Sequence, residues 1–348
     1  MQRFIAFGLV FSSFFLVVTG LPRLIAQDNP CLTRTIPVTP IDARGTPLQD
    51  LQASSLLGKV HGRPVAILSA TLNTQPRRIM ICVDTSGSMM APGLWSVIRM
   101  MLEDIARVGP TVGQLGMELF AEDVFDVVNI SPNPNAVRMK TASVLAAEVE
   151  DLVPKRARKT ALVDALWQAG DHFTPPRPGD VIYVLTDGHD NRSHHTGKQL
   201  EDRLLSRATR VFAFLTALPF TPYGRVLAEE EFGPEALNGI ATMTGGHLIY
   251  LCPNPRDLGC EKWPNYFADW TKGEQRSAPL GAAHLLYQQM AVYYDVTIRL
   301  PFALEKRADL DLGIVDDWGH KRKDIELLYP HRLPPCERTS PMAPTAPN

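Results

Sequence analysis

The chain has 348 residues, more than one average domain needs, so we expect one large domain with additional segments. Its formal net charge of −2 argues against a nucleic-acid-binding protein, which would show a basic excess. The 29 prolines cluster in loops and in the C-terminal tail, and we expect residues 334–348 to be disordered.

The N-terminus has the pattern of a secretory signal peptide. Arg3 supplies a positive charge, residues 4–18 form an apolar run, and cleavage after Gly20 or Ala26 fits the small residues there. We therefore assign residues 1–26 to a signal peptide, with an uncleaved N-terminal membrane anchor as the alternative. No second apolar run of bilayer length follows, so we expect a secreted or periplasmic protein with no further membrane span.

Strands and helices alternate over residues 76–292. This alternation predicts an α/β domain with a doubly wound, mainly parallel six-stranded sheet and helices on both faces. Residues 121–123 are too short for a crossover, so the two strands beside them form a hairpin with one antiparallel edge strand. The expected strands are 79–84, 115–120, 124–129, 181–186, 210–217 and 247–251. The expected helices are about 94–108, 136–152, 161–173, 197–208, 235–243 and 280–292.

Both flanks of this domain read as β structure, at residues 33–75 and 293–333. Apolar residues alternate loosely at 55–60 and 64–72 and more clearly at 294–300 and 308–315. In a doubly wound fold the first strand begins, and the last helix ends, on the same side of the domain. We therefore expect the two flanks to emerge side by side and to form a small β-sandwich-like region.

The most informative segment is 79–89, where an apolar strand ends in Asp84 and short oxygen-bearing side chains follow at Ser86 and Ser88. A loop curling over the strand end can turn these three side chains toward one point. One carboxylate and two hydroxyls form half of an oxygen-only shell, which suits a hard cation. Thr160, before a helical pattern, and Asp187, after a second buried strand, would lie at the same carboxyl edge of a parallel sheet.

Each piece alone has an ordinary explanation. Ser86 or Asp84 could cap a helix, Thr160 could do the same, and Asp187-Gly188 could be a simple turn. The three segments together, in this order, are what makes the pattern specific.

These residues resemble the metal-ion-dependent adhesion site (MIDAS) of von Willebrand factor type A (VWFA) domains. The resemblance implies that Ser86, Ser88 and Thr160 bind a divalent metal directly or through water, and that Asp84 and Asp187 often act through water. Mg²⁺ is the expected ion, with Mn²⁺ or Ca²⁺ as alternatives. An open coordination position would accept a carboxylate from a partner protein.

A broader and less specific resemblance covers residues 33–332. The segment from Asp42 to Leu51 reads D-x-x-G-x-P-x-x-x-L, and a strand beginning at Tyr294 follows the domain. This layout is similar to an exported VWFA-related family typical of Acidobacteria.

Five cysteines are compatible with an oxidising compartment. Cys82 lies inside a predicted strand and is expected to be a buried free thiol. Cys252 and Cys260 flank a short loop and are candidates for a local disulfide. Cys31 and Cys336 lie near the two ends of the folded region, and a bridge there would clamp the termini. Sequence alone does not fix the connectivity.

Other segments are open to two interpretations. The basic run 155–159 either forms a cationic rim beside the metal or is an ordinary solvated loop. His189, His194 and His195 could add a second metal or a pH response, but we favour surface loop residues. The insertions 219–234 and 252–279 have no assigned role; the second carries Trp263, Tyr266, Phe267 and Trp270, which would serve a partner or cover the core.

Two functions compete. The first is a non-catalytic, metal-dependent adhesion module that binds an acidic protein ligand. The second is a metal-assisted hydrolase, for which His189 and Asp190 are the candidate bases near the site, although no recognised nucleophile motif accompanies them. A scaffold with an unused metal site is a third interpretation. The sequence leaves the oligomeric state open.

Overall fold

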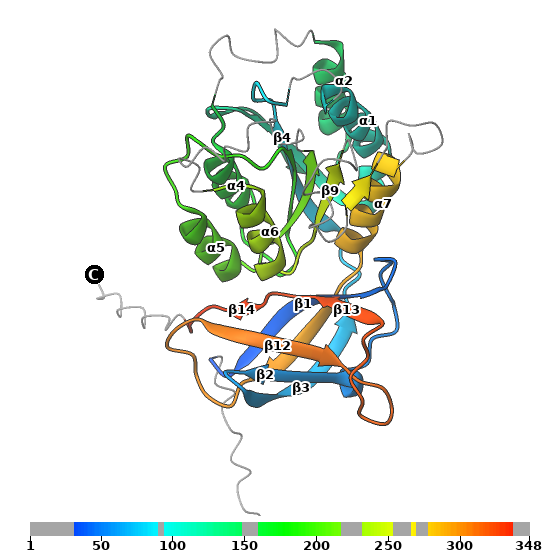
Figure 1. Cartoon of the computed structure of the whole chain (residues 1–348), viewed down its shortest axis with the longest axis vertical. Coiled ribbons are helices and arrows are strands. Elements are labelled where there is room, and N and C mark those ends of the chain that lie inside the picture. The colour runs from blue at the N-terminus through cyan, green and yellow to red at the C-terminus, as the bar shows by residue number, and fades with distance from the viewer. Residues whose placement is uncertain are drawn as a thin grey trace, which may run out of the picture.

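The computed structural model describes residues 31–89, 94–147, 159–216, 232–252, 266–268 and 278–336. These residues form two seven-stranded sheets stacked end to end (Figure 1). The predicted signal peptide, the C-terminal tail, most of the two insertions and Cys260 lie outside the described residues.

The larger sheet has the strand order β10-β9-β8-β7-β4-β5-β6. All neighbours in it are parallel except β5 and β6, which form the predicted hairpin. The six expected strands are present, and the short β10 within the second insertion adds a seventh that was not predicted. The bounds are β4 Arg77–Asp84, β5 Gly113–Phe120, β6 Val124–Ser131, β7 Val181–Thr186, β8 Arg210–Thr216, β9 Leu248–Cys252 and β10 Tyr266–Ala268.

Helices cover both faces of this sheet, as expected for a doubly wound fold. One face packs against α1, α2 and α7, and the other packs against α4, α5 and α6, so each face has its own apolar core (Figure 1). Strands β4, β7 and β8 are buried along their whole length because they are covered on both sides. The bounds are α1 Leu94–Val112, α2 Asn135–Ala146, α4 Leu162–Asp171, α5 Gly197–Ser206, α6 Pro234–Met243 and α7 Ala278–Ala291.

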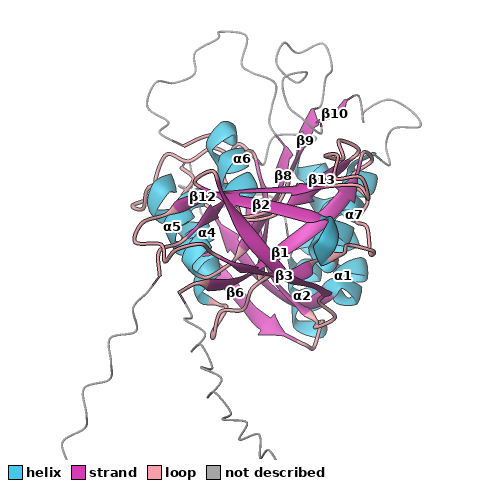
Figure 2. Ribbon diagram, turned by 90° about the horizontal axis from the view of Figure 1, so that it is seen from below, coloured by secondary structure: helices cyan, strands magenta, loops and turns pink. Residues whose placement is uncertain are grey.

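The flanks build the second sheet, in the order β13-β1-β11-β3-β2-β12-β14. Figure 2 shows β2 and β12 running across the direction of β1 and β3, and all seven strands contribute to one apolar core. The sandwich-like region is therefore a single antiparallel sheet that curls on itself. The bounds are β1 Thr33–Asp42, β2 Leu56–Val60, β3 Arg63–Leu72, β11 Tyr294–Arg299, β12 Ala308–Ile314, β13 Ile325–Leu328 and β14 Arg332–Leu333, with a 3-10 turn at Ala53–Ser55.

Two chain crossings join the sheets, and they lie side by side as predicted. The backbone N–H of Asn73 donates to the carbonyl of Tyr293 at 3.0 Å, and the Asn73 amide donates to Asp295 at 2.6 Å. The guanidinium of Arg77 lies 3.9 Å from the centre of the Tyr293 ring. These contacts fix the curled sheet beneath the amino ends of β4 and β8, opposite the predicted metal site.

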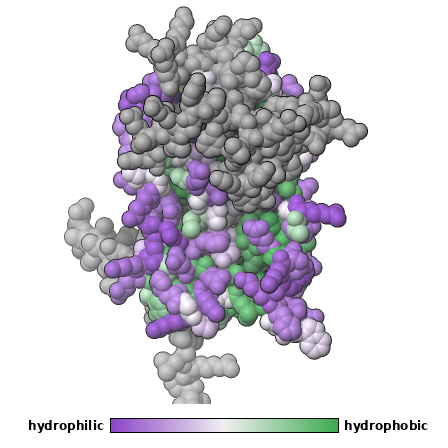
Figure 3. Space-filling view, viewed as in Figure 1, coloured by the Kyte–Doolittle hydropathy of each residue, from purple (hydrophilic) through white to green (hydrophobic). Residues whose placement is uncertain are grey.

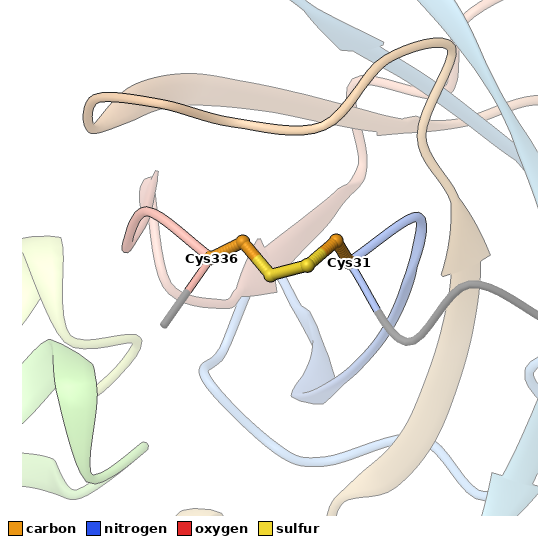
Figure 4. The surroundings of a disulfide bond; sticks show 2 residues. All are labelled: Cys31 and Cys336. Atoms are coloured by element: carbon orange, nitrogen blue, oxygen red, sulfur yellow. A yellow bond between two sulfur atoms is a disulfide. The ribbon is translucent and has the colours of Figure 1, made fainter. Parts of the chain in front are cut away.

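The disulfide between Cys31 and Cys336 closes the curled sheet (Figure 4). Their Cα atoms are 5.3 Å apart, a usual separation for bonded cysteines. This pairing confirms the predicted clamp between the two ends of the folded region. Cys82 is a buried free thiol in β4, as expected.

Candidate metal centre

Asp84 is the last residue of β4, and the chain turns tightly after it. One Asp84 carboxylate oxygen accepts a hydrogen bond from the backbone N–H of Ser86 at 2.8 Å, so the chain curls back over the strand end. The hydroxyls of Ser86 and Ser88 lie 3.2 Å apart. Asp84 and Ser86 are buried and Ser88 is exposed, so the cluster opens toward solvent on the Ser88 side.

Asp187 joins this cluster through the neighbouring strand β7. Thr186, at the end of β7, donates its hydroxyl to the second Asp84 oxygen at 2.7 Å. The backbone N–H of Gly188 donates to the same hydroxyl at 3.0 Å, with Gly188 at φ +84°. This left-handed turn carries the chain over the strand end, so Asp187 stands beside Asp84.

Thr160 reaches the same edge by way of β5. The backbone N–H groups of Thr85 and Ala161 donate to the carbonyls of Phe120 and Ala121, at 2.8 and 2.7 Å. The two loops are thus anchored at successive residues at the end of β5. The structure places all five predicted residues at the carboxyl edge of the sheet.

Asn191 holds Thr160 in place, a role that our reading of the sequence did not assign. Its side-chain oxygen accepts from the Thr160 N–H at 2.9 Å, and its own N–H donates to the Thr160 carbonyl at 3.0 Å. The polar run that follows Asp187 in the sequence could have indicated a residue whose side chain binds a neighbouring loop. These two hydrogen bonds fix the position of Thr160 relative to the edge of the sheet.

Asp190, a candidate base from the sequence, is occupied by structural contacts. It accepts hydrogen bonds from the backbone N–H groups of Val163, Arg192 and Ser193 and from the Ser193 hydroxyl, at 2.6 to 3.1 Å. Asp190 therefore ties the loop to the first turn of α4.

The histidines of this loop also fasten it to α4. The Nδ1 atoms of His194 and His195 lie 2.9 and 2.6 Å from the two oxygens of Asp164, and both backbone N–H groups donate to the same carboxylate. Burial raises the pKa of Asp164, but these hydrogen bonds outweigh it and lower the pKa to about 2. Their hydrogen bonds to Asp164 make His194 and His195 anchors of this loop. Among the described residues no group of three His, Cys, Asp or Glu side chains is placed to hold a metal.

Electrostatics make the edge of the sheet suitable for a cation. Burial and then the neighbouring Asp187 raise the pKa of Asp84 to about 7, although hydrogen bonds from Ser86 and Thr186 act to lower it. Within the described ranges no Lys, Arg or His forms an ion pair with either carboxylate. Two buried acids beside three hydroxyls match the oxygen donors that Mg²⁺, Mn²⁺ or Ca²⁺ prefers.

No family model and no curated protein matches the chain. Solved structures do match it, including two von Willebrand factor type A proteins and the bacterial protein BatB. The larger sheet is mainly parallel, with helices on both faces and one antiparallel edge hairpin, which is the fold class predicted from the sequence.

The likenesses are distant in sequence. BatB from Bacteroides thetaiotaomicron is 17% identical, covering 61% of this chain and 98% of its own, with a TM-score of 0.41. Proximal thread matrix protein 1 from the mussel byssus, with a zinc-occupied MIDAS motif, is 15% identical over 66% of this chain and 50% of its own, at 0.43. A von Willebrand factor type A protein from Catenulispora acidiphila is 11% identical over 87% and 74%, at 0.40.

Proposed function

We propose that this protein is an exported, non-catalytic binding module that holds a divalent metal and uses it to bind an acidic side chain of a partner protein. The proposed ligands are Asp84, Ser86, Ser88, Thr160 and Asp187, with Mg²⁺ as the expected ion. The observation that carries the proposal is the pair of buried carboxylates, Asp84 and Asp187, which interact electrostatically and form no ion pair with a cation among the described residues.

The residues present fit such an ion. A bound divalent cation would neutralise the two carboxylates and offer a Lewis-acidic position to an incoming oxygen. Asp84 and Asp187 are held by backbone and hydroxyl donors, so they are pre-organised. Ser88 is exposed, which leaves the site open on the side from which a partner carboxylate would approach.

A binding role is favoured over hydrolysis because Asp190, one of the two candidate bases, is not free to act on a substrate. Its carboxylate accepts four hydrogen bonds from its own loop and α4. A hydrolase needs a base or nucleophile aimed at the metal-bound group.

Export is supported by the disulfide, since such bonds persist mainly in oxidising compartments. The helices in the described part of the chain are all too short or too polar to cross a bilayer. We propose a periplasmic or secreted location, reached through the predicted signal peptide at residues 1–26.

The test is metal-dependent stabilisation of the mature protein. We expect Mg²⁺ or Mn²⁺ to raise the melting temperature of the wild type, and Ser88→Ala to weaken metal affinity roughly tenfold without changing the metal-free melting temperature. Ser143→Ala, at an exposed position of α2, is the matched control and should bind metal normally. A wild type whose stability and calorimetric heat do not respond to either metal contradicts the proposal.

A further inference from the structure

A groove of about 840 Å³ lies on the side of the molecule, next to residues that adjoin the proposed metal site. At one end lie Lys159 and Asn191, and at the other lie Arg307 and Arg332 of the curled sheet. In between it follows α5 and α6, which lie side by side above β14 (Figure 1).

The groove adjoins the metal site through the neighbours of Thr160, although none of the five proposed ligands lines it. Lys159 directly precedes the proposed ligand Thr160, and Asn191 exchanges two hydrogen bonds with it. A polypeptide whose carboxylate sat on the metal would therefore lie close to this end of the groove, and each further extended residue would advance it by about 3.3–3.6 Å.

Cationic side chains outnumber acidic ones along the groove. Its two acidic residues are already engaged: Asp190 by backbone N–H groups, and Glu201 by Arg332 at 2.8 Å and Arg307 at 3.6 Å. Three further cations have no carboxylate partner among the described residues: Lys159, Arg192 and Lys198.

This excess is local, because the whole chain carries a formal charge of −2. Figure 3 shows hydrophilic side chains gathered where α5 meets the curled sheet. A cationic groove on a nearly neutral protein attracts anionic partners selectively and raises their association rate.

One wall of the groove is apolar and comes from α6. Phe232 precedes this helix, and Ala236, Ile240 and Met243 follow along it. Gly239 lies among them, and a Cβ placed on it would meet no atom within 4 Å. Phe232 and Ile240 are buried, so the apolar contact that the groove offers comes mainly from the half-buried Ala236 and Met243, with room at Gly239.

Resting on the proposed function, we propose that this groove binds the segment of the partner that adjoins its metal-binding carboxylate, and that this segment is an acidic peptide with an apolar residue. Further carboxylates would pair with Lys159, Arg192 and Lys198, and the apolar side chain would pack on α6. The partner is thus recognised by an acidic-apolar stretch and not by a single carboxylate.

The experiment measures fluorescence anisotropy of two labelled, amidated peptides, EEEELL and ESSSLL, with the mature protein in Mn²⁺ at low salt. We expect EEEELL to bind at least roughly tenfold more tightly than ESSSLL. Arg192→Glu with Lys198→Glu should remove this preference. Gly239→Leu should weaken EEEELL by a similar factor, because the new side chain fills the groove.

Two matched controls separate groove effects from general ones. Gly281→Leu changes an equally open glycine on α7, and Lys59→Glu reverses an exposed charge on the curled sheet; both should bind EEEELL as the wild type does. All groove variants should keep the Mn²⁺-induced rise in melting temperature.

The outcomes distinguish this proposal from the one it rests on. If the wild type binds Mn²⁺ but does not prefer EEEELL, or if the groove variants bind it normally, the groove proposal is wrong and the metal site stands. If EEEELL binds through the groove without Mn²⁺ and also to Ser88→Ala, the groove stands and the metal-dependent function fails. Tighter binding of a labelled oligonucleotide, or groove-dependent self-association in light scattering, would overturn the assignment to an acidic peptide.

Discussion

Glu118 is an acidic residue in the middle of a buried strand. It stands beside Cys82 in the β4–β5 register, and its Oε2 lies 3.7 Å from Nε2 of His172. Its side chain is fully buried, and burial raises its pKa to about 8. At neutral pH the carboxyl is therefore mostly neutral, which is how an apolar core tolerates it.

This pKa gives the protein a pH-dependent stability. Because the folded-state pKa lies above the ordinary value of 4.5, the stabilising contribution is complete below about pH 4.5 and is lost as the pH rises to about 8. We expect the free energy of unfolding of the wild type to fall, relative to Glu118→Gln, by roughly 2–5 kcal/mol between pH 5 and pH 8.

Urea denaturation in EDTA at a series of pH values measures this difference. Asp84 titrates in both proteins, so its contribution cancels. Glu103→Gln, at an exposed position of α1, is the control and should follow the wild type at every pH. Parallel pH curves for wild type and Glu118→Gln would show that Glu118 is ionised in the folded state at neutral pH.

At the scale of elements, the metal site depends on turns at the ends of strands. Gly188 takes a φ of +84° directly after Asp187, and a Cβ on it would lie 2.7 Å from Cδ1 of Leu215. The backbone conformation disfavours any residue with a side chain, and the close approach to Leu215 adds to this penalty. The dipeptide Asp187-Gly188 alone suggested only a turn; the structure adds the reason that the turn favours glycine.

We therefore expect Gly188→Ala to destabilise the protein by about 1–3 kcal/mol and to weaken metal binding. Gly62→Ala is the matched control, because Gly62 also has a positive φ, +74°, but has no atom within 4 Å of the added Cβ. Gly62→Ala should be destabilised by the backbone strain alone, about 1 kcal/mol, and should bind metal normally. Equal losses in the two variants, by chemical denaturation and metal titration, would contradict the role of the Leu215 contact.

Helix α1 shows why some boundaries escaped prediction. Gly109-Pro110 is a usual stop signal, and we expected the helix to end near residue 108, yet it continues to Val112. Pro110 cannot donate to the carbonyl of Ala106, four residues earlier. That carbonyl instead accepts a hydrogen bond from Nε of Arg138, in α2, at 3.0 Å. Partners from distant segments are not visible in a local pattern.

At the scale of the whole molecule, the sequence predicted what periodicity and short-range order determine. The alternating strands and helices gave the doubly wound sheet, and its topology placed Asp84, Thr160 and Asp187 at one edge and the flanks at the opposite end. Asn191 and the groove beside α6 were not predicted, because each depends on residues far apart in the chain meeting across a surface.

The disulfide between Cys31 and Cys336 joins residues that are 305 apart in sequence. A cross-link over such a long loop removes much conformational freedom from the unfolded chain, which stabilises the folded state by about 3–5 kcal/mol. We expect the double variant Cys31→Ser with Cys336→Ser to be destabilised by this amount in guanidinium denaturation. In a background that carries Cys252→Ser and Cys260→Ser, reductant should lower the stability equally while Cys31 and Cys336 are present. Reductant should have no effect once they too are replaced, because Cys82 is buried and unpaired. Free Cys31 and Cys336 thiols in a non-reduced digest of the exported protein, by mass spectrometry, would contradict the clamp.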